Sequence, residues 1–514
     1  MRDSILLGFA TGIFILLMAG CALASDDGES VAVYTVADTT GDWGFPSPYA
    51  HYSRGPGYTR MSFIFDTLIW KDEEEYVPAL AEDWEIEGDD VYIFYLRDGI
   101  TWHDDEEFDA DDVVFTVDYI KDHPYQWIDS SIIESAEALD DHTVEITLSA
   151  PYAPFLDQVA GTLPILPEHI WENVNDPVNF KDQEALIGTG PYTLDVDDYD
   201  KVHGTYRYQA YEDYYLGTPK VKELIFVKIS EPNAKAQLTQ GYVNTAGIQP
   251  EMIDPLKDEF VILSVPSHWW NYKLMINHQK EPMSDKRFRQ ALAYAIDREN
   301  LVTIAGRGYG LAGSPGFIPS DHSWYNNDID GLYSHNPTKA KDLLDDMGYD
   351  GQEIELLVKS GRATEERIGE LIKTDLVSVG ITVDLRPMDS KTVDSKVSEW
   401  DFDLALSGHG GLIGDPNFLA RNTIDMGSFN SARYDENADL TDLLEEQVTE
   451  TDEDDRGELI DQAQVLYAED VPALTLYYTE AFVAHDEQVD LYYTYNGMAL
   501  GIPITLNKLS FVGV

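Results

Sequence analysis

Cysteine and basic side chains are both scarce in this chain of 514 residues. Its single cysteine, Cys21, excludes a disulfide within the chain and a zinc site built on several thiolates. Against 95 Asp and Glu there are only 34 Lys and Arg, which gives a formal net charge of −61. Proteins bind DNA and RNA through clustered basic side chains, and the sequence has no basic stripe. We therefore expect no nucleic acid among its partners.

Enzyme motifs are missing as well. The chain has no Walker loop and no His-Glu-x-x-His sequence. Residues 308–313 satisfy Gly-x-Gly-x-x-Gly, but they follow a predicted helix instead of a strand and so indicate a loop. A catalytic carboxylate pair cannot be recognised among so many acids. The sequence predicts no catalytic residue, no metal site and no cofactor, and an exported hydrolase stays open as an alternative.

One long apolar run stands at the N-terminus. Residues 4–24 are nearly uncharged and lie between a short start with one arginine and a polar segment, which is typical of an export signal. Residues 17–20 before Cys21 resemble a lipoprotein processing box, with Met18 where leucine is usual. An uncleaved membrane anchor is the alternative, because about 20 apolar residues can span a bilayer. In both cases we expect the protein outside the cytoplasm, anchored to the membrane through its N-terminus.

Acidic and apolar residues are both abundant. With 43% hydrophobic residues the chain has enough material for true cores, and its length favours several lobes. The acids are spread over the whole sequence, which is typical of a halophilic-like surface kept soluble by repulsion. We expect a monomer whose self-repulsion is screened in high salt.

The hydrophobic patterning is that of a mixed α/β (α+β) protein. Strands are predicted at residues 31–36, 91–96, 142–150, 187–194, 220–229, 353–360, 380–388 and 402–407. Helices are predicted at residues 284–300, 336–349 and 364–378, with Ser284 as N-cap of the first. Asp109 is expected to cap another helix, which carries Val113 and Val117.

Aromatic residues gather in a way that suggests a ligand cleft. Trp269, Trp270, Asn271 and Tyr272 are consecutive, and large half-polar side chains of this kind often line binding sites. Trp400 and His409 carry side chains of the same character.

Several segments resemble the family 5 extracellular solute-binding proteins of ABC importers, which include dipeptide-, oligopeptide- and nickel-binding proteins. Residues 78–119 are similar to the family signature. The matching positions are Leu80-Ala81, Trp84, Leu96-Arg97, Gly99, His103-Asp104, Ala110 and Asp112-Val113. Further matches follow in order at residues 165–171, 188–192, 284–300, 336–349 and Asp415-Pro416.

This resemblance implies a two-lobed periplasmic-binding-protein-like fold with a hinge and an extra domain in the N-terminal lobe. The expected division is a signal or lipoprotein segment at 1–26, lobe I at 27–75, 187–267 and 480–514, the extra domain II at 76–186 and lobe III at 268–479. The implied function is capture of a small solute, a peptide-like compound or a metal chelate, between closing lobes and its delivery to the ABC transporter permease in the membrane. A sugar- or oligosaccharide-binding member of the same fold is the alternative.

One loop departs from the family pattern. In peptide-binding members an Asp three residues before the acid of the Asp/Glu-Pro pair binds the free ammonium of the peptide, and a Trp stands three residues earlier. Leu412 and His409 occupy these places here, and Asp415 is the acid. A buried ammonium without a counter-charge costs several kcal/mol, so ordinary peptides are not expected as ligands. The expected ligand-binding set is Trp269, Trp270, Asn271, Tyr272, Trp400, His409, Gly411, Leu412 and Asp415, although Asp415 also suits a cap for the helix that follows.

Overall fold

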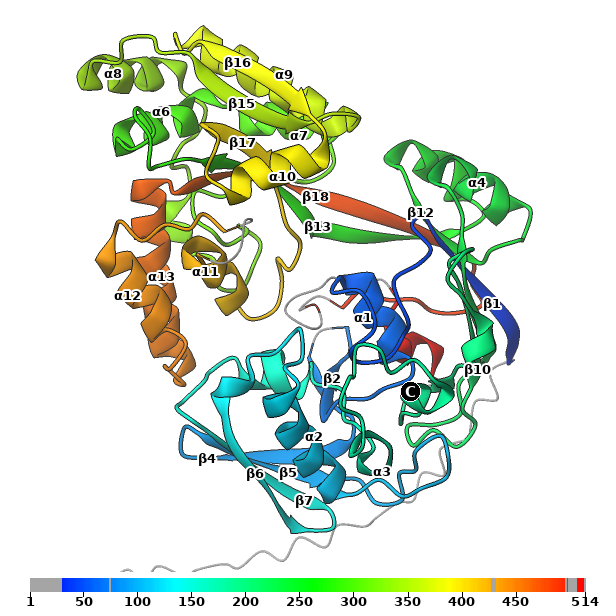
Figure 1. Ribbon diagram of the computed structural model, residues 1–514. Coiled ribbons are helices and arrows are strands. Elements are labelled where there is room, and N and C mark those ends of the chain that lie inside the picture. Colours follow the sequence, from blue (N-terminus) through cyan, green and yellow to red (C-terminus); the bar gives the residue numbers. More distant parts are fainter. Residues whose placement is uncertain (1–29, 74, 427–430, 495–496, 498–505, 513–514) are drawn as a thin grey trace, which may run out of the picture.

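The computed structural model describes residues 30–512 except 74, 427–430, 495–496 and 498–505. Cys21 and the predicted export segment lie outside the described residues. The mixed α/β class is confirmed, because helices cover a mixed sheet that extends through two lobes (Figure 1). Within the described ranges no helix is both long enough and apolar enough to cross a membrane.

The main sheet has twelve strands in the order β16-β15-β17-β13-β18-β12-β1-β11-β10-β8, with β14 on β18 and β9 on β10. Their bounds are β1 (Val31–Asp38), β8 (Tyr192–Thr193), β9 (Tyr199–Asp200), β10 (Thr205–Ala210), β11 (Val221–Lys228), β12 (Thr245–Ile248), β13 (Val261–Ile276), β14 (Leu311–Ala312), β15 (Ile354–Lys359), β16 (Val383–Met388), β17 (Leu404–Ser407) and β18 (Ala473–His485). We use lobe I for the half with β1 and β8–β12, and lobe III for the half with β15–β17.

Two long strands, β13 and β18, connect these lobes. They pair antiparallel from Val261↔His485 to Met275↔Ala473, with a register shift between Val265 and Trp270. β12 pairs with the lobe I end of β18, and β17 pairs with the lobe III end of β13. Figure 1 shows both strands crossing the centre of the molecule. Crossing strands of this kind are the hinge about which two lobes can close.

Domain II is a separate layer beside lobe I. Its sheet has the order β4-β5-β7-β6, formed by β4 (Ala81–Glu87), β5 (Val91–Leu96), β6 (Ile133–Asp140) and β7 (Thr143–Leu148), and a ribbon of β2 (Ile69–Lys71) and β3 (Tyr76–Pro78) lies next to it. Helix α2 (Ala110–Asp122) packs on this sheet through Val113 and Val117. Asp109 caps α2 in a capping box with Asp112, as the sequence predicts.

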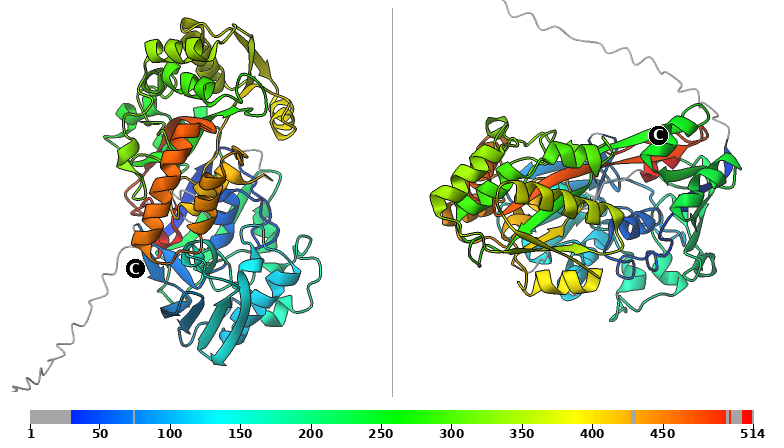
Figure 2. Two further views of the ribbon diagram at one scale, coloured as in Figure 1. Left: turned by 90° about the vertical axis from the view of Figure 1, so that its left-hand side faces the viewer. Right: turned by 90° about the horizontal axis from the view of Figure 1, so that it is seen from above.

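The remaining helices belong to the two lobes. Lobe I carries α1 (Gly55–Ser62), α4 (Glu231–Thr239) and α5 (Ile253–Leu256), and α3 (Glu168–Trp171) lies against α2. Lobe III carries α6 (Lys286–Ala295), α7 (Arg298–Ile304), α8 (Pro337–Met347), α9 (Ala363–Ser378), α10 (Ser390–Ser398), α11 (Asn417–Ile424), α12 (Ala438–Glu446) and α13 (Glu453–Asp470). Figure 2 shows α13 extending from lobe III toward domain II. Near the start of α13, Thr451 donates to the carboxylate of Asp89 at 3.0 Å.

Three sequence predictions of local structure are wrong. The helix expected at 284–300 is two helices, α6 and α7, because Asp297 caps a second helix after a break at Ile296. The N-cap of α6 is Asp285, whose carboxylate accepts the N–H of Arg287, and not Ser284.

The strand predicted at 187–194 shrinks to the two residues of β8. Gly188 and Gly190 pass so close to Ile64 that an added Cβ on either would lie 2.1–2.6 Å from its backbone. The glycines therefore serve a close approach of two chain segments and not a sheet ladder.

The signature residues hold domain II to lobe I. The backbone N–H of His103 donates to Gly188, its Nε2 bonds to the carbonyl of Gly190 at 2.9 Å, and its Nδ1 accepts from Gly188. Arg97 donates to the carbonyl of Ala79. The contacts of His103 join segments 85 and 87 positions apart, whereas the Arg97 contact spans 18 positions within domain II. All of them are structural.

Candidate ligand cleft

Lobe III and domain II touch on one side of the hinge. The side-chain amide of Asn417 donates to Tyr152 at 3.3 Å and to Gln158 at 3.2 Å. The backbone N–H of Ala153 donates to the carbonyl of Val448 at 2.8 Å. Lobe III and domain II are therefore in direct contact on this side of the hinge.

A cleft of about 460 Å³ lies beside this contact. Its lining comes from both sides: Gln126, Trp127, Ile128, Asp129 and Gln158 from domain II, and His409, Phe418, Arg421, Asn422 and Asp425 from lobe III. The volume suits a small solute, and a site made by two lobes exists only when they are together.

Helix α11 supplies most of the lobe III wall. Phe418, Arg421, Asn422 and Asp425 are spaced at i, i+3, i+4 and i+7, which places them on one side of the helix. Leu419, on another side, is buried in the apolar cluster of this lobe. The helical period therefore places the polar residues Arg421, Asn422 and Asp425 on the side that lines the cleft.

His409 is fixed in one tautomer by Asn271. The Asn271 Oδ1 accepts the backbone N–H of His409 at 2.9 Å, so its amide nitrogen must face the ring and donates to Nε2 at 3.2 Å. The Nδ1 of His409 then carries the proton and donates to the carbonyl of Gly410 at 2.8 Å. Both ring nitrogens are engaged, so His409 meets the cleft through its carbon edge and not through a hydrogen bond.

Burial keeps this histidine neutral. Burial, and to a lesser extent the charge of Lys273, lower the pKa of His409 to about 3, although the bond to Gly410 acts in the opposite direction. Lys273 is itself buried on the same face of β13 as Asn271, and burial lowers its pKa to about 7.

Other residues of the expected set lie around β13. Trp270 is 38% exposed, and its indole lies against Gly408. Tyr272 packs on Tyr477 with ring centroids 5.2 Å apart, against the other lobe III core. The backbone of Trp269 is part of β13, and its side chain is outside the described structure. Trp270 adjoins the loop of His409, but neither Trp270 nor Tyr272 is among the residues that line the cleft.

Leu412 and Asp415 have internal partners. Leu412 is 0% exposed and belongs to an apolar cluster with Leu419. Asp415 forms a bidentate ion pair with Arg456 at 2.7 and 2.8 Å and accepts the backbone N–H of Asn417, which caps the start of α11. Neither side chain lines the cleft. Gly411 takes a φ of 72°, which a side chain would strain.

Trp400 is remote from this loop. The backbone carbonyl of Trp400 accepts a hydrogen bond from Asn277. Asn277 is six residues from Asn271, which corresponds to about 20 Å along an extended strand. The Arg433 guanidinium lies 4.1 Å from the centre of the Trp400 ring. Among the expected residues whose side chains the structure describes, His409 is the one in the cleft lining.

The sequence interpretation missed Gln126, Trp127, Gln158 and Arg421. The available signal for Arg421 was the i, i+3, i+4, i+7 pattern beginning at Phe418. Gln126 and Trp127 follow the end of α2, and Gln158 lies in a later helical turn, Leu156–Ala160. None of them carries a motif, so only the fold brings them to the cleft.

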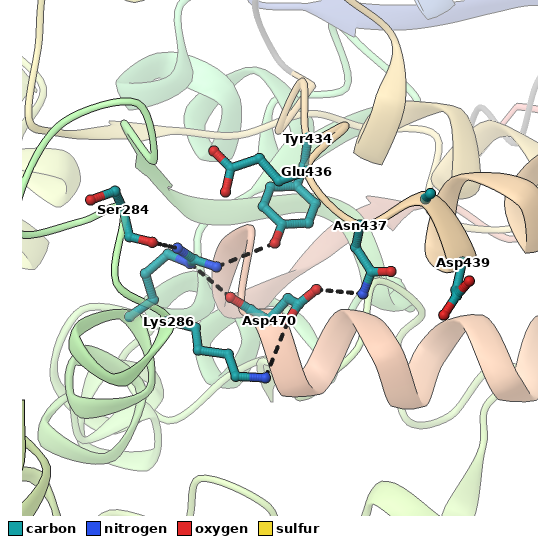
Figure 3. A pocket seen from close by; sticks show the side chains of 9 residues that line it. Ser284, Lys286, Tyr434, Glu436, Asn437, Asp439 and Asp470 are labelled. Atoms are coloured by element: carbon teal, nitrogen blue, oxygen red, sulfur yellow. Dashed lines mark hydrogen bonds and ion pairs between the residues drawn. The ribbon is translucent and has the colours of Figure 1, made fainter.

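A second cavity of about 420 Å³ lies entirely on lobe III (Figure 3). There Asp470 accepts from Asn437 at 2.7 Å and faces Lys286 at 3.9 Å, while buried Arg289 donates to backbone carbonyls. Lys286 and Asp470 pair with each other, and all the lining residues belong to lobe III, so lobe closure would not enclose this cavity. In the described part of the chain, no group of three or more His, Cys, Asp or Glu is arranged to hold a metal ion.

Comparison with known proteins identifies the family. The family model of the bacterial extracellular solute-binding proteins, family 5 (middle), matches residues 75–429. The dipeptide-binding protein of Escherichia coli is 28% identical over 445 residues, which cover 79% of this chain and 82% of that protein. Heme-binding protein A of Haemophilus influenzae is 28% identical over 462 residues, 82% of each chain.

A solved structure agrees with these relatives. The ABC transporter substrate-binding protein CtaP of Listeria monocytogenes superposes with a TM-score of 0.79 at 26% identity, covering 90% of this chain and 95% of its own. This confirms the two-lobed fold. The relatives are binding proteins, so the comparisons support the solute-binding interpretation and not the exported hydrolase. The match over residues 75–429 shows that the chain belongs to the family 5 extracellular solute-binding proteins of ABC transporters.

Proposed function

We propose that this protein is the solute-binding component of an ABC importer and holds a small solute in the cleft between domain II and lobe III. The observation that carries this proposal is the double lining of the cleft, with Gln158 from one side and Arg421 from the other. A solute that contacts both walls binds the closed form more tightly than the open form and so stabilises the closed form. The closed form then delivers the solute to the permease. The domain boundaries expected from the sequence are part of this proposal.

The proposed cargo is a small peptide-like compound or a metal chelate that lacks a free ammonium at the usual place. Relatives are named for dipeptides and for heme, so the family covers both classes. Leu412 provides no carboxylate for an ammonium, and Asp415 is already paired with Arg456. The protein binds and releases this cargo without catalysis, as a monomer.

Mass spectrometry of the purified protein tests the proposal. The protein is washed, denatured and filtered, and the released small molecules are compared with those from the same volume of buffer. We expect one compound in near-equal molar amount to the protein. Absence of any released compound, together with no closure on addition of candidate solutes, would contradict the proposed function.

We also propose that Cys21 is lipidated and anchors the protein on the outer face of the cytoplasmic membrane. Replacing the cysteine tests this, because Cys21→Ser removes the thiol that carries the lipid. We expect the wild type in the membrane fraction and Cys21→Ser in the soluble fraction. Membrane retention of Cys21→Ser would favour the uncleaved anchor.

A further inference from the structure

Arg421 is unusual among the arginines of this protein. Its guanidinium makes no hydrogen bond and no ion pair with any residue that the structure describes, although the chain contains 95 acids. Every other arginine in the described ranges donates at least one side-chain hydrogen bond. The one arginine without such a bond is also the one that lines the cleft between the lobes.

The surroundings of Arg421 leave its charge available. Arg421 lines the cleft together with residues of domain II, and its charge acts on Tyr152 there, against the rise in the pKa of Tyr152 that burial causes. On the same wall His409 is neutral and has both ring nitrogens engaged.

The two acids of the lining have partners elsewhere. Asp129 accepts from the backbone and hydroxyl of Ser131 at 3.1 and 2.7 Å. Asp425 is also engaged in an interaction of its own. Neither forms an ion pair with Arg421 in this structure.

Arg421 is exposed at the cleft, and the two carboxylates that also line the cleft form no ion pair with it, so its N–H donors are open to a solute. A carboxylate of the solute matches the planar fork of the arginine guanidinium with two parallel, charge-assisted hydrogen bonds. We infer that Arg421 is the anchor for a carboxylate of the solute, so that the cargo of this protein is an organic anion. This inference rests on the proposed function and names the class of its solute.

Matched acids and amides test the inference by calorimetry. The compounds are N-acetylalanine, N-acetyldialanine and galacturonic acid, each beside its carboxamide, with inorganic phosphate as a separate arm. The proteins are the wild type, Arg421→Gln and Arg421→Lys. Arg367→Gln is the control, because it removes the same charge from an exposed position of α9 in lobe III.

We expect at least one acid to bind the wild type more tightly than its amide. Arg421→Gln should weaken that acid by about 10- to 100-fold, the loss of a charge-assisted hydrogen bond, and Arg421→Lys by less. Arg367→Gln should bind like the wild type. A preference for phosphate over all three carboxylates would overturn the assignment to a carboxylate.

Three other results overturn the inference. They are equal binding of every acid and its amide, unchanged binding of the acid by Arg421→Gln, and a co-purifying solute without an anionic group. In the last case the proposed function stands and only the class of solute is wrong. Failure of the proposed function itself has a different signature, since no solute is then released at all.

Discussion

At the scale of single residues, burial of neutral histidines links stability to pH. His51 is buried between lobe I and domain II, where its Nδ1 donates to the carbonyl of Tyr52 at 2.9 Å and its Nε2 accepts from Gln126 at 3.1 Å. Burial lowers its pKa to about 4, against the bond to Tyr52. In the unfolded chain His51 becomes protonated below about pH 6.5, whereas in the folded protein it becomes protonated only below about pH 4. Stability is therefore complete above 6.5 and is lost as the pH falls through this window.

The replacement His51→Asn should reduce this loss. Asparagine keeps a donor for Tyr52 and has no titrating group, so the slope of unfolding free energy against pH between 6.5 and 4 should fall by up to about 1.4 kcal/mol per pH unit. Urea unfolding at pH 7, 6 and 5 measures the slope. His409, with its pKa lowered to about 3, remains as a source of residual slope. An identical slope in wild type and variant would show that His51 titrates normally.

Leu412 stands at the loop position where peptide-binding relatives are expected to carry an ammonium-binding Asp, but here this position contributes to an apolar core. Its side chain fills an apolar cluster with Leu419 and Tyr434. Leu412→Asp buries a carboxylate without a partner and should cost about 3 kcal/mol or more of folding stability, while Leu412→Met should cost less than about 1.5 kcal/mol. Urea unfolding of the three proteins measures both. If Leu412→Asp is as stable as the wild type, the side chain reaches the cleft and can serve as an ammonium anchor.

At the scale of elements, the ion pair between Asp415 and Arg456 joins the start of α11 to α13. Arg456 is buried and also donates to the carbonyl of Gln447, so loss of Asp415 leaves an enclosed charge without its counter-ion. We expect Asp415→Asn to destabilise lobe III by about 3–5 kcal/mol. Thermal unfolding followed by tryptophan fluorescence measures the effect.

The exposed pair of Asp254 and Lys257 provides the matched control. The Lys257 Nζ lies 2.6 Å from the Asp254 Oδ1, the two residues are three positions apart, and both side chains are exposed to water. Asp254→Asn should therefore leave the melting temperature almost unchanged. Equal effects of Asp254→Asn and Asp415→Asn would mean that the Arg456 pair contributes no more than a surface contact.

Elements with their own end signals could be predicted from the sequence. Helix α8 begins after Asn336, which caps it, and ends at Gly348 with a φ of 74°. Strands β15 and β16 and helix α9 follow their hydrophobic periods in the same way.

Long-range partners could not be predicted. Asp415 pairs with an arginine 41 positions later, and Arg421 faces a wall contributed by domain II. Nothing in the local pattern marks these partners, because they meet only when the lobes are assembled. For the same reason the sequence named His409 in the cleft and missed its neighbours on α11.

At the scale of the whole molecule, the net charge of −61 opposes the compact state. Salt shortens the range of this repulsion to about 3 Å at 1 M, so the melting temperature should rise as sodium chloride increases from 0.05 M to 1 M. Differential scanning calorimetry measures it. Potassium chloride at matched ionic strength is the control, since simple screening does not distinguish the two cations. A flat or falling curve would mean that paired charges or bound cations already cancel the repulsion.

Closure of the lobes around a solute is the central claim, and small-angle X-ray scattering tests it most directly. The protein is stripped of solute by unfolding and refolding, and its radius of gyration is measured before and after the co-purifying compound is returned. With the solute, the scattering curve should match the closed arrangement in which Asn417 contacts Tyr152 and Gln158, and the radius of gyration should be smaller than without it. An unchanged radius of gyration, with binding of the solute shown by calorimetry in the same sample, would contradict the claim.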